Sequence, residues 1–211
     1  SALSEEVSTR IKVPDASVEV DGDWKADLTV RRPSTGYWLT IPSGATGTYL
    51  GTRWGLPGDI SIIGDYDGDK KSDISVWRPW TGVWYMRSSR NPGTYSAILW
   101  GLQNDEPVPG DYDGDAVTDL AMWRPSTGIW YVKPSSNPEG YTRTNWGISS
   151  DVPVPCDYDG DGKTDVAVWR PETGQWHILP SGRPGTSISV TWGHSSDVPV
   201  AGDYDGDGKT D

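Results

Sequence analysis

The sequence repeats itself with a fixed period of 46 residues, and this repeat restricts the possible folds more than any other feature. The motif Asp65-Tyr66-Asp67-Gly68-Asp69 returns at 111–115, 157–161 and 203–207, and a variant stands at 19–23. Trp-Gly pairs begin at Trp54, Trp100, Trp146 and Trp192, and Thr-Gly-x-Trp ends at Trp38, Trp84, Trp130 and Trp176. Since no insertion shifts the register, we expect a lead-in segment at 1–12 and repeats over 13–211, with units at about 13–58, 59–104, 105–150 and 151–196 and a partial unit at 197–211.

Each unit has the pattern of four short β-strands. In the fourth unit the candidate strands are Asp151 to Pro155, Val166 to Trp169, Gln175 to Leu179 and Ser187 to Trp192. Gly or Pro interrupts the windows that have helical spacing, so helix is expected to be nearly absent. A unit of four strands and this length matches a β-propeller blade. The sequence therefore predicts an all-β propeller of 46-residue, four-stranded blades, in a ring that this chain leaves incomplete.

The acidic motif of each unit predicts a metal site. The loop from Asp157 to Asp165 has carboxylates at positions 1, 3, 5 and 9, and its glycines permit a tight wrap. Oxygen-rich ligand sets suit Ca²⁺, whereas Zn²⁺ prefers His and Cys. An EF-hand would need Glu at position 12, where Val168 stands inside a candidate strand. The alternative is a plain Asp-Gly turn without metal, which needs only one acid.

We expect a calcium ion at each of the three middle loops, and up to five in all. Position 7 would contribute its backbone carbonyl. The first loop departs from the pattern at Glu19 and Trp24, and Asp211 is the last residue of the fifth. The predicted ligands are Glu19, Asp21, Asp23, Lys25 and Asp27; Asp65, Asp67, Asp69, Lys71 and Asp73; Asp111, Asp113, Asp115, Val117 and Asp119; Asp157, Asp159, Asp161, Lys163 and Asp165; and Asp203, Asp205, Asp207, Lys209 and Asp211.

Charge narrows the classes of partner. The chain has 18 Lys and Arg against 30 Asp and Glu, a net charge of −12. The negative electrostatic field of such a chain repels phosphate groups, so neither nucleic acid nor an anionic membrane surface is an expected partner. No apolar stretch approaches the length of about 20 residues that a membrane-spanning helix needs, so membrane insertion is not expected either.

The order of the motifs carries a family resemblance. Trp-Gly, then Asp-Val-Pro-Val, then the acidic loop, then a strand ending in Trp-Arg-Pro resembles the FG-GAP or VCBS type of repeat found in integrin-like propellers. The resemblance covers about 13–211, although Trp stands where the family usually has Phe. It implies a calcium-stabilised, secreted or cell-surface propeller used for adhesion or recognition, with a glycan or protein ligand. The alternative is a purely structural scaffold or spacer attached to a larger secreted protein or enzyme.

Aromatic residues divide into recurring and single ones. Recurring tryptophans are expected to pack between blades, with a sugar site on every blade as the alternative. The recurring Arg32, Arg78, Arg124 and Arg170 are expected to stack on aromatic rings or to pair with loop carboxylates. Trp24, Tyr37 and Trp80 break the repeat, and they are the candidate ligand-binding residues.

We expect no catalysis. His177 and His194 stand at positions that Leu, Ile or Tyr fill in other units, and Cys156 replaces a repeated glycine before a loop.

The remaining expectation concerns the fifth unit, which stops before its second strand. Strands that complete it would come from a second copy, from another chain or from a longer parent chain.

Overall fold

The computed structural model describes residues 18–45 and 47–211, so the predicted lead-in segment at 1–12 and the start of the first unit lie outside it. The strands are β1 (Leu28–Arg32), β2 (Tyr37–Ile41), β3 (Leu50–Arg53), β4 (Ile60–Ser61), β5 (Ile74–Arg78), β6 (Val83–Arg87), β7 (Tyr95–Leu99), β8 (Glu106–Pro107), β9 (Leu120–Arg124), β10 (Ile129–Lys133), β11 (Thr142–Asn145), β12 (Val152–Pro153), β13 (Val166–Arg170), β14 (Gln175–Leu179) and β15 (Ile188–Thr191). The described residues form no helix, as expected. Accordingly, they include no helix capable of crossing a membrane.

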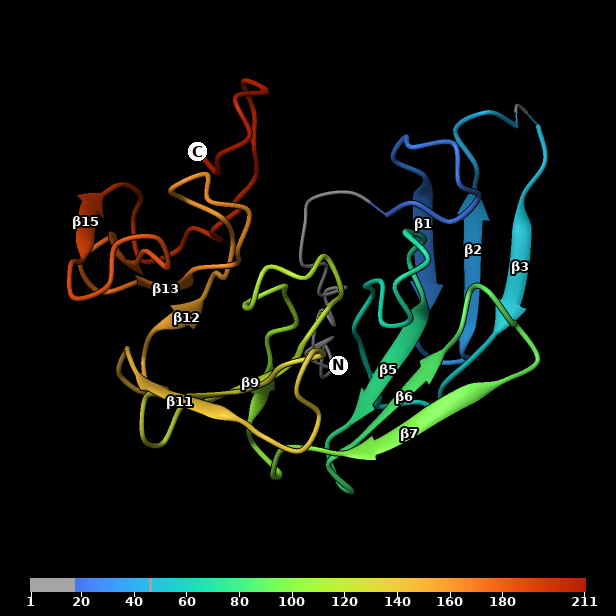
Figure 1. Ribbon diagram of the computed structural model, residues 1–211, viewed down its shortest axis with the longest axis horizontal. Helices are drawn as coiled ribbons and strands as arrows, with labels where there is room; N and C mark the ends of the chain where they lie inside the picture. Colours follow the sequence, from blue (N-terminus) through green and yellow to red (C-terminus); the bar gives the residue numbers. More distant parts are fainter. Residues whose placement is uncertain (1–17, 46) are drawn as a thin grey trace, which may run out of the picture.

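The strands form four antiparallel sheets, and the predicted all-β propeller is confirmed. Three sheets have four strands, in the orders β4-β5-β6-β7, β8-β9-β10-β11 and β12-β13-β14-β15, and the first is β1-β2-β3. The period places the counterpart of β4 in the first sheet at 14–15, outside the described residues. The four blades follow one another around an open arc (Figure 1), and no strand pairing among the described residues joins the last sheet to the first.

A repeated glycine sets the tight hairpin between the second and third strands of each blade. Gly82 has φ of 68° and its N–H donates to the Arg78 carbonyl at 2.8 Å. A Cβ at this position would lie 2.5 Å from the Gly101 carbonyl oxygen. The left-handed conformation and the lack of space both require glycine, which explains why the Thr-Gly-x-Trp motif recurs.

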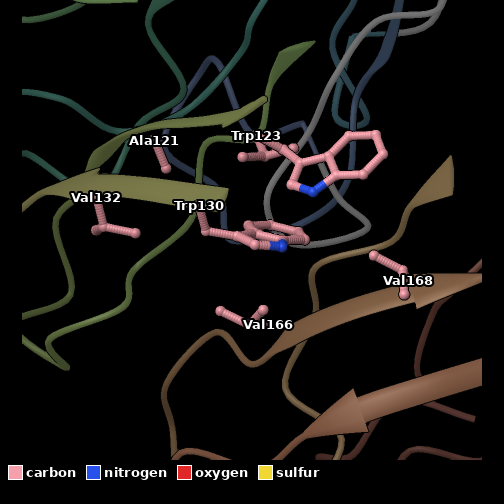
Figure 2. Close-up of a cluster of buried hydrophobic side chains, with 7 residues drawn as sticks. Ala121, Trp123, Trp130, Val132, Val166 and Val168 are labelled. Carbon is pink, nitrogen blue, oxygen red and sulfur yellow. The ribbon is translucent and has the colours of Figure 1, made fainter. Parts of the chain in front are cut away.

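The hydrophobic cores lie between consecutive blades. Val166 and Val168 of β13 belong to one buried cluster with Trp123 and Trp130 of the preceding blade (Figure 2). One blade earlier, Leu120 and Met122 belong to the equivalent cluster with Trp77 and Trp84. Trp38, Trp84 and Trp130 are at most 1% exposed, so the expected packing of the recurring tryptophans is confirmed for them. A sugar cannot stack on rings that are buried in this way.

An arginine at the end of the second strand ties each complete blade to its first strand. Arg78 Nε lies 2.9 Å from Asp59 Oδ1, Arg124 Nε 2.8 Å from Asp105 Oδ1, and Arg170 Nε 2.8 Å from Asp151 Oδ1. The expected stacking is confirmed for Arg78 and Arg124, whose guanidinium groups lie 4.4 and 4.5 Å from the ring centres of Tyr85 and Tyr131. The alternative pairing with loop carboxylates is wrong for these arginines, since the partners are aspartates that precede β4, β8 and β12. The salt bridges are largely buried and two-pronged, which is the geometry that makes such pairs strong.

Candidate metal centres

Each complete acidic loop connects the first strand of a blade to the second, so the fold places all these loops at corresponding positions. Within each loop three carboxylates have ligand oxygens within 4.8 Å of one another. These groups are Glu19, Asp21 and Asp27; Asp65, Asp67 and Asp73; Asp111, Asp113 and Asp115; Asp157, Asp159 and Asp165; and Asp203, Asp205 and Asp211. Positions 1, 3 and 9 meet in four loops, and positions 1, 3 and 5 meet in the third. Each loop therefore brings together three of its four predicted carboxylates, while position 5 in four loops and position 9 in the third lie outside the group.

The carboxylate at position 1 shapes the loop around itself. Asp65 Oδ1 accepts the Gly68 N–H at 2.7 Å, and its Oδ2 accepts the Lys70 N–H at 2.7 Å. Asp157 accepts the N–H groups of Gly160 and Gly162 at 2.7 and 2.8 Å. These hydrogen bonds turn the backbone inward, which brings the later carboxylates toward the first.

The carboxylate at position 9 is buried and closes the loop. Asp73 Oδ2 accepts the Tyr66 N–H at 2.9 Å, and Asp73 is 1% exposed. Asp119 and Asp165 make the same contact with Tyr112 and Tyr158, at 2.8 and 2.9 Å. Each ties the end of its loop to the beginning.

A serine from the loop between the third and fourth strands supports each of the first four acidic loops, and we did not predict it. The Ser181 N–H donates to Asp165 Oδ1 at 2.7 Å, and its hydroxyl donates to Asp161 Oδ2 at 2.8 Å. Ser43, Ser89 and Ser135 make the equivalent pair of contacts. The signal was present in the sequence, because these four serines are one period apart.

The site chemistry fits a hard divalent cation. Asp67 Oδ1 and Asp159 Oδ1, both at position 3, are buried and accept no hydrogen bond, and of the two only Asp67 Oδ1 has an ion-pair partner among the described residues, Arg90 at 3.9 Å. A buried carboxylate oxygen without a partner is costly unless a cation compensates it. Asp69 and Asp161, at position 5, each accept the N–H of position 7 at 2.9 Å. The proposed ligation by the position-7 carbonyls stays a prediction.

When no cation is present, burial also makes the ionised form of the loop carboxylates less favourable than the protonated form. Burial raises the pKa of Asp73 to about 6, and the same cause raises the pKa of Asp119 to about 6. Backbone hydrogen bonds lower both pKa values in part, whereas neighbouring carboxylates raise them further. The pKa of Asp165 is raised by burial as well. A bound cation would reverse this balance by favouring the ionised carboxylates.

Neighbouring loops contact each other around a central cavity of about 790 Å³. The Thr164 N–H donates to the Asp111 carbonyl at 2.6 Å, and the Thr210 N–H donates to the Asp157 carbonyl at 2.7 Å. The Lys71 ammonium donates to the Asp21 carbonyl at 2.8 Å, so this position-7 side chain bridges two loops. Neighbouring loops are therefore joined by direct hydrogen bonds.

The three candidate ligand-binding aromatics are exposed but do not form one cluster. Trp24, Tyr37 and Trp80 are 74, 43 and 52% exposed. Trp24 lies in the first acidic loop, before β1, whereas Tyr37 pairs with Arg32 at the other end of that strand. Trp80 lies in the hairpin turn after β5, at the end away from the acidic loop. Lys70 lies 5.2 Å from the Trp24 ring centre, and Arg78 lies 5.5 Å from that of Trp80.

His177 pairs with a serine, and among the described residues no carboxylate contacts its ring. His177 Nδ1 lies 3.1 Å from Ser189 Oγ, its cross-strand neighbour, and His177 Nε2 has no partner. Since no carboxylate holds that second nitrogen, the pair lacks the orienting group of a serine hydrolase. Cys156 is buried directly before an acidic loop.

Comparison with known proteins supports the interpretation of the repeats. A family model described as an FG-GAP-like repeat matches residues 157–211. The match begins at the fourth acidic loop and ends with the fifth, so the suspected family resemblance is confirmed over this segment. In a search of the curated proteins, nothing matches the chain significantly.

Solved structures resemble this repeat chain in fold. Virginiamycin B lyase from Staphylococcus aureus matches with a TM-score of 0.51 and 9% identity, over 83% of this chain and 54% of that one. A streptogramin B lyase structure matches with a TM-score of 0.54 and 7% identity, over 87% and 57% of the two chains. The chain thus spans little more than half the length of these structures, and at such low identity the likeness is one of fold alone.

Proposed function

We propose that this chain is a calcium-stabilised β-propeller module for recognition or adhesion outside the cell. The observation that carries the proposal is the repeated carboxylate cluster, with the buried Asp159 Oδ1 that accepts no hydrogen bond and with the supporting serines. Calcium accepts six to eight oxygen ligands in flexible geometry, which suits loops that gather carboxylates and carbonyls. Because the loops contact one another, ions in them would stabilise the contacts between blades as well as each blade.

The extracellular part of the proposal is supported by the calcium concentration at which such sites are filled. Calcium sites of extracellular modules bind the ion in the range of about 10⁻⁴ to 10⁻³ M, and we propose that these loops belong to that class. Calcium at such concentrations is available outside cells. Secretion or surface display is therefore the setting in which these loops would be filled.

The proposed ligand is a glycan or a protein, bound without catalysis. Support comes from the exposed aromatics that break the repeat, Trp24, Tyr37 and Trp80, since single exposed tryptophans and tyrosines favour recognition surfaces. The net charge of −12 argues against nucleic acid. A scaffold without any ligand of its own is the competing function, and a glycan array in calcium separates the two. Ligand binding that is lost in Trp80→Ser supports recognition, whereas an array with no bound glycan, together with no protein partner, favours the scaffold.

The calcium part is tested by thermal unfolding with and without EDTA. A ligand that binds only the native state stabilises it by about 4 kcal/mol per site at a thousandfold excess over Kd. Melting should fall sharply in chelator, and Asp159→Ala should remove part of the effect. Glu139→Ala, an exposed acid outside the loops, is the matched control. Asp151 is unsuitable as a control because it is buried and holds Arg170. Superimposable melting curves in calcium and in EDTA would show that the loops bind no structural ion.

A further inference from the structure

Three aromatic side chains, Trp100, Tyr131 and Tyr141, form a cleft between the second and third blades, which are neighbours in the arc of Figure 1. The Trp100 ring centre, just after β7, lies 5.6 Å from that of Tyr141, just before β11. The ring centres of Tyr131, on β10, and Tyr141 are 6.5 Å apart. These rings line a cavity of about 250 Å³. Because Tyr141 is 56% exposed, this aromatic cleft is accessible from solvent.

The fold does not need the two tyrosines of the aromatic cleft. At the boundary between the third and fourth blades, the period places His177 and Ser187 where Tyr131 and Tyr141 stand. That boundary closes nevertheless, because the Trp146 indole N–H donates to the His177 carbonyl at 2.9 Å and a buried cluster joins the two blades. Partly exposed rings that packing does not require favour a role in binding.

Two cations flank the aromatic cleft. The Lys133 ammonium lies 5.5 Å from the Trp100 ring centre, and the Arg143 guanidinium lies 5.6 Å from that of Tyr131. Among the described residues neither cation lies within salt-bridge distance of a carboxylate. The ammonium donates one N–H to the Pro138 carbonyl and has two more. Both cations can therefore donate to an anionic group in the cleft.

The carboxylate that lines the cleft does not cancel this positive charge. Asp105 is buried, and its two oxygens accept hydrogen bonds from Arg124 at 2.8 and 2.9 Å. Arg124 also donates to the Tyr131 hydroxyl oxygen at 3.1 Å, and that hydroxyl still has its own proton to donate. The cleft is thus locally positive, in a chain whose net charge is −12, and it places hydrogen-bond donors beside aromatic rings.

We propose that the aromatic cleft binds a uronic acid residue of a glycan. The C–H face of the sugar lies against the rings of Trp100 and Tyr141, because the faces of aromatic rings carry negative potential. The carboxylate of the sugar accepts hydrogen bonds from the Arg143 guanidinium, whose planar fork matches its geometry. This inference rests on the proposed recognition function and gives it a site separate from the candidate aromatics Trp24, Tyr37 and Trp80.

The size and chemistry of the cleft favour a sugar over a peptide. Its volume lies below the range of about 300–1,000 Å³ that drug-sized ligands occupy, so it accommodates one small ring of a longer chain. No unmodified amino acid side chain joins a ring-sized C–H face to a carboxylate, whereas a uronic acid has both and also carries hydroxyls for the Tyr131 donor.

The first boundary between blades shows which part of the cleft is special. There Trp54, Tyr85 and Tyr95 repeat the three rings, with centres 5.3 Å apart for Trp54 and Tyr95 and 6.4 Å apart for the two tyrosines. The counterpart of Arg143 in that second blade is Ala97. The rings therefore recur, whereas the arginine is added in the third blade, and we expect preference for an acidic sugar in that cleft.

The test measures binding of oligosaccharides to the full chain by isothermal titration calorimetry. The probes are the tetramers of galacturonic, glucuronic and mannuronic acid, and the tetramers of galactose, glucose and mannose are the matched neutral ligands. All titrations use one calcium concentration, since uronates are themselves oxygen ligands for Ca²⁺. At least one uronate should bind about tenfold or more tightly than its neutral counterpart, as expected for a charge-assisted pair.

Two variants place this binding in the cleft. Arg143→Ala should remove the preference for the uronate, and Tyr141→Ser should weaken its binding about tenfold or more. Both substitutions introduce residues that other units carry at the same position, Ala97 and Ser187, so the fold accepts them and circular dichroism should be unchanged.

Tyr49→Ser is the matched control. Tyr49 is the counterpart of Tyr141 in the first unit and is 70% exposed, but the sequence has Ser8 at the position of the partner tryptophan, so uronate binding should be unchanged. Absence of uronate binding, equal binding of uronates and neutral tetramers, or uronate binding that Tyr141→Ser and Arg143→Ala do not affect would overturn the assignment of the cleft. The proposed recognition function fails on a different result, a chain that binds no glycan on the array and no protein partner.

Discussion

Trp130 and Trp176 occupy the same position in consecutive blades but differ in what covers them, and replacing each by alanine tests the packing between blades. Trp130 is fully buried beneath the following blade, whereas Trp176 is half-buried because its face is open. Their indole N–H groups make the same hydrogen bond, to the Trp146 carbonyl at 2.9 Å and to the Trp192 carbonyl at 3.1 Å. The two substitutions therefore remove the same chemical groups and differ in how deeply the removed ring is buried.

The expected decreases in stability follow from burial. Trp130→Ala removes a fully enclosed ring and leaves a cavity, which costs about 3–5 kcal/mol. The Trp146 carbonyl keeps one donor, the Trp123 indole N–H at 3.3 Å, so no orphaned acceptor adds to this decrease. For Trp176→Ala the ring leaves a half-exposed position and water fills the space, so we expect about 1–2 kcal/mol.

Urea unfolding followed by circular dichroism measures both decreases, and the comparison is made on the two midpoints at constant calcium. Both variants lack one tryptophan, so fluorescence changes alone do not distinguish them. A decrease for Trp176→Ala that equals or exceeds that for Trp130→Ala would refute the view that the core lies between blades.

Three further predictions concern the acidic loops. Ala116 has φ of 64°, a left-handed conformation that favours glycine, so Ala116→Gly should raise the free energy of unfolding by up to about 1 kcal/mol. The control Ala97→Gly, on exposed β7, should lower that free energy. A lower free energy of unfolding for both variants, measured by urea titration, would contradict this prediction. Ser135→Ala should weaken calcium binding by the third loop about tenfold, as loss of a supporting hydrogen bond does; an unchanged calcium titration would contradict it. The pKa values of Asp73 and Asp119 are raised to about 6, so protonation of these carboxylates stabilises the metal-free chain at low pH, and this stabilisation is lost as pH rises through 6. Because calcium competes with these protons, calcium affinity should fall as pH drops below 6. A calcium affinity that does not change between pH 5 and 7 would contradict this prediction.

The sequence predicted the blades because the 46-residue period has no insertions, so one unit could be compared directly with the next. It also predicted that the acids of each loop converge, because a loop of nine residues keeps them close, and three of the four carboxylates in each loop do so. The partners of Arg78, Arg124 and Arg170 were not predictable in the same way. Their aspartates lie 19 residues earlier, and the pairing depends on the first strand lying beside the second.

The supporting serines show a different limit. Ser43, Ser89, Ser135 and Ser181 recur with the period, yet each lies 20 residues from the carboxylate that its hydroxyl contacts. Serine is common in loops, so only the fold distinguishes a serine that supports a carboxylate from one that faces water. Exposure of the single aromatics also needed the structure, because burial depends on neighbouring blades.

The most direct test of the account is to count calcium ions bound per chain, by equilibrium dialysis and metal analysis at saturating calcium. The geometry of the five loops predicts at least three bound ions, rising to five if the first and last loops also bind, and Asp159→Ala should lower the count by one. A count near zero, with Asp159→Ala indistinguishable from the unaltered chain, would contradict the central claim that these loops hold calcium.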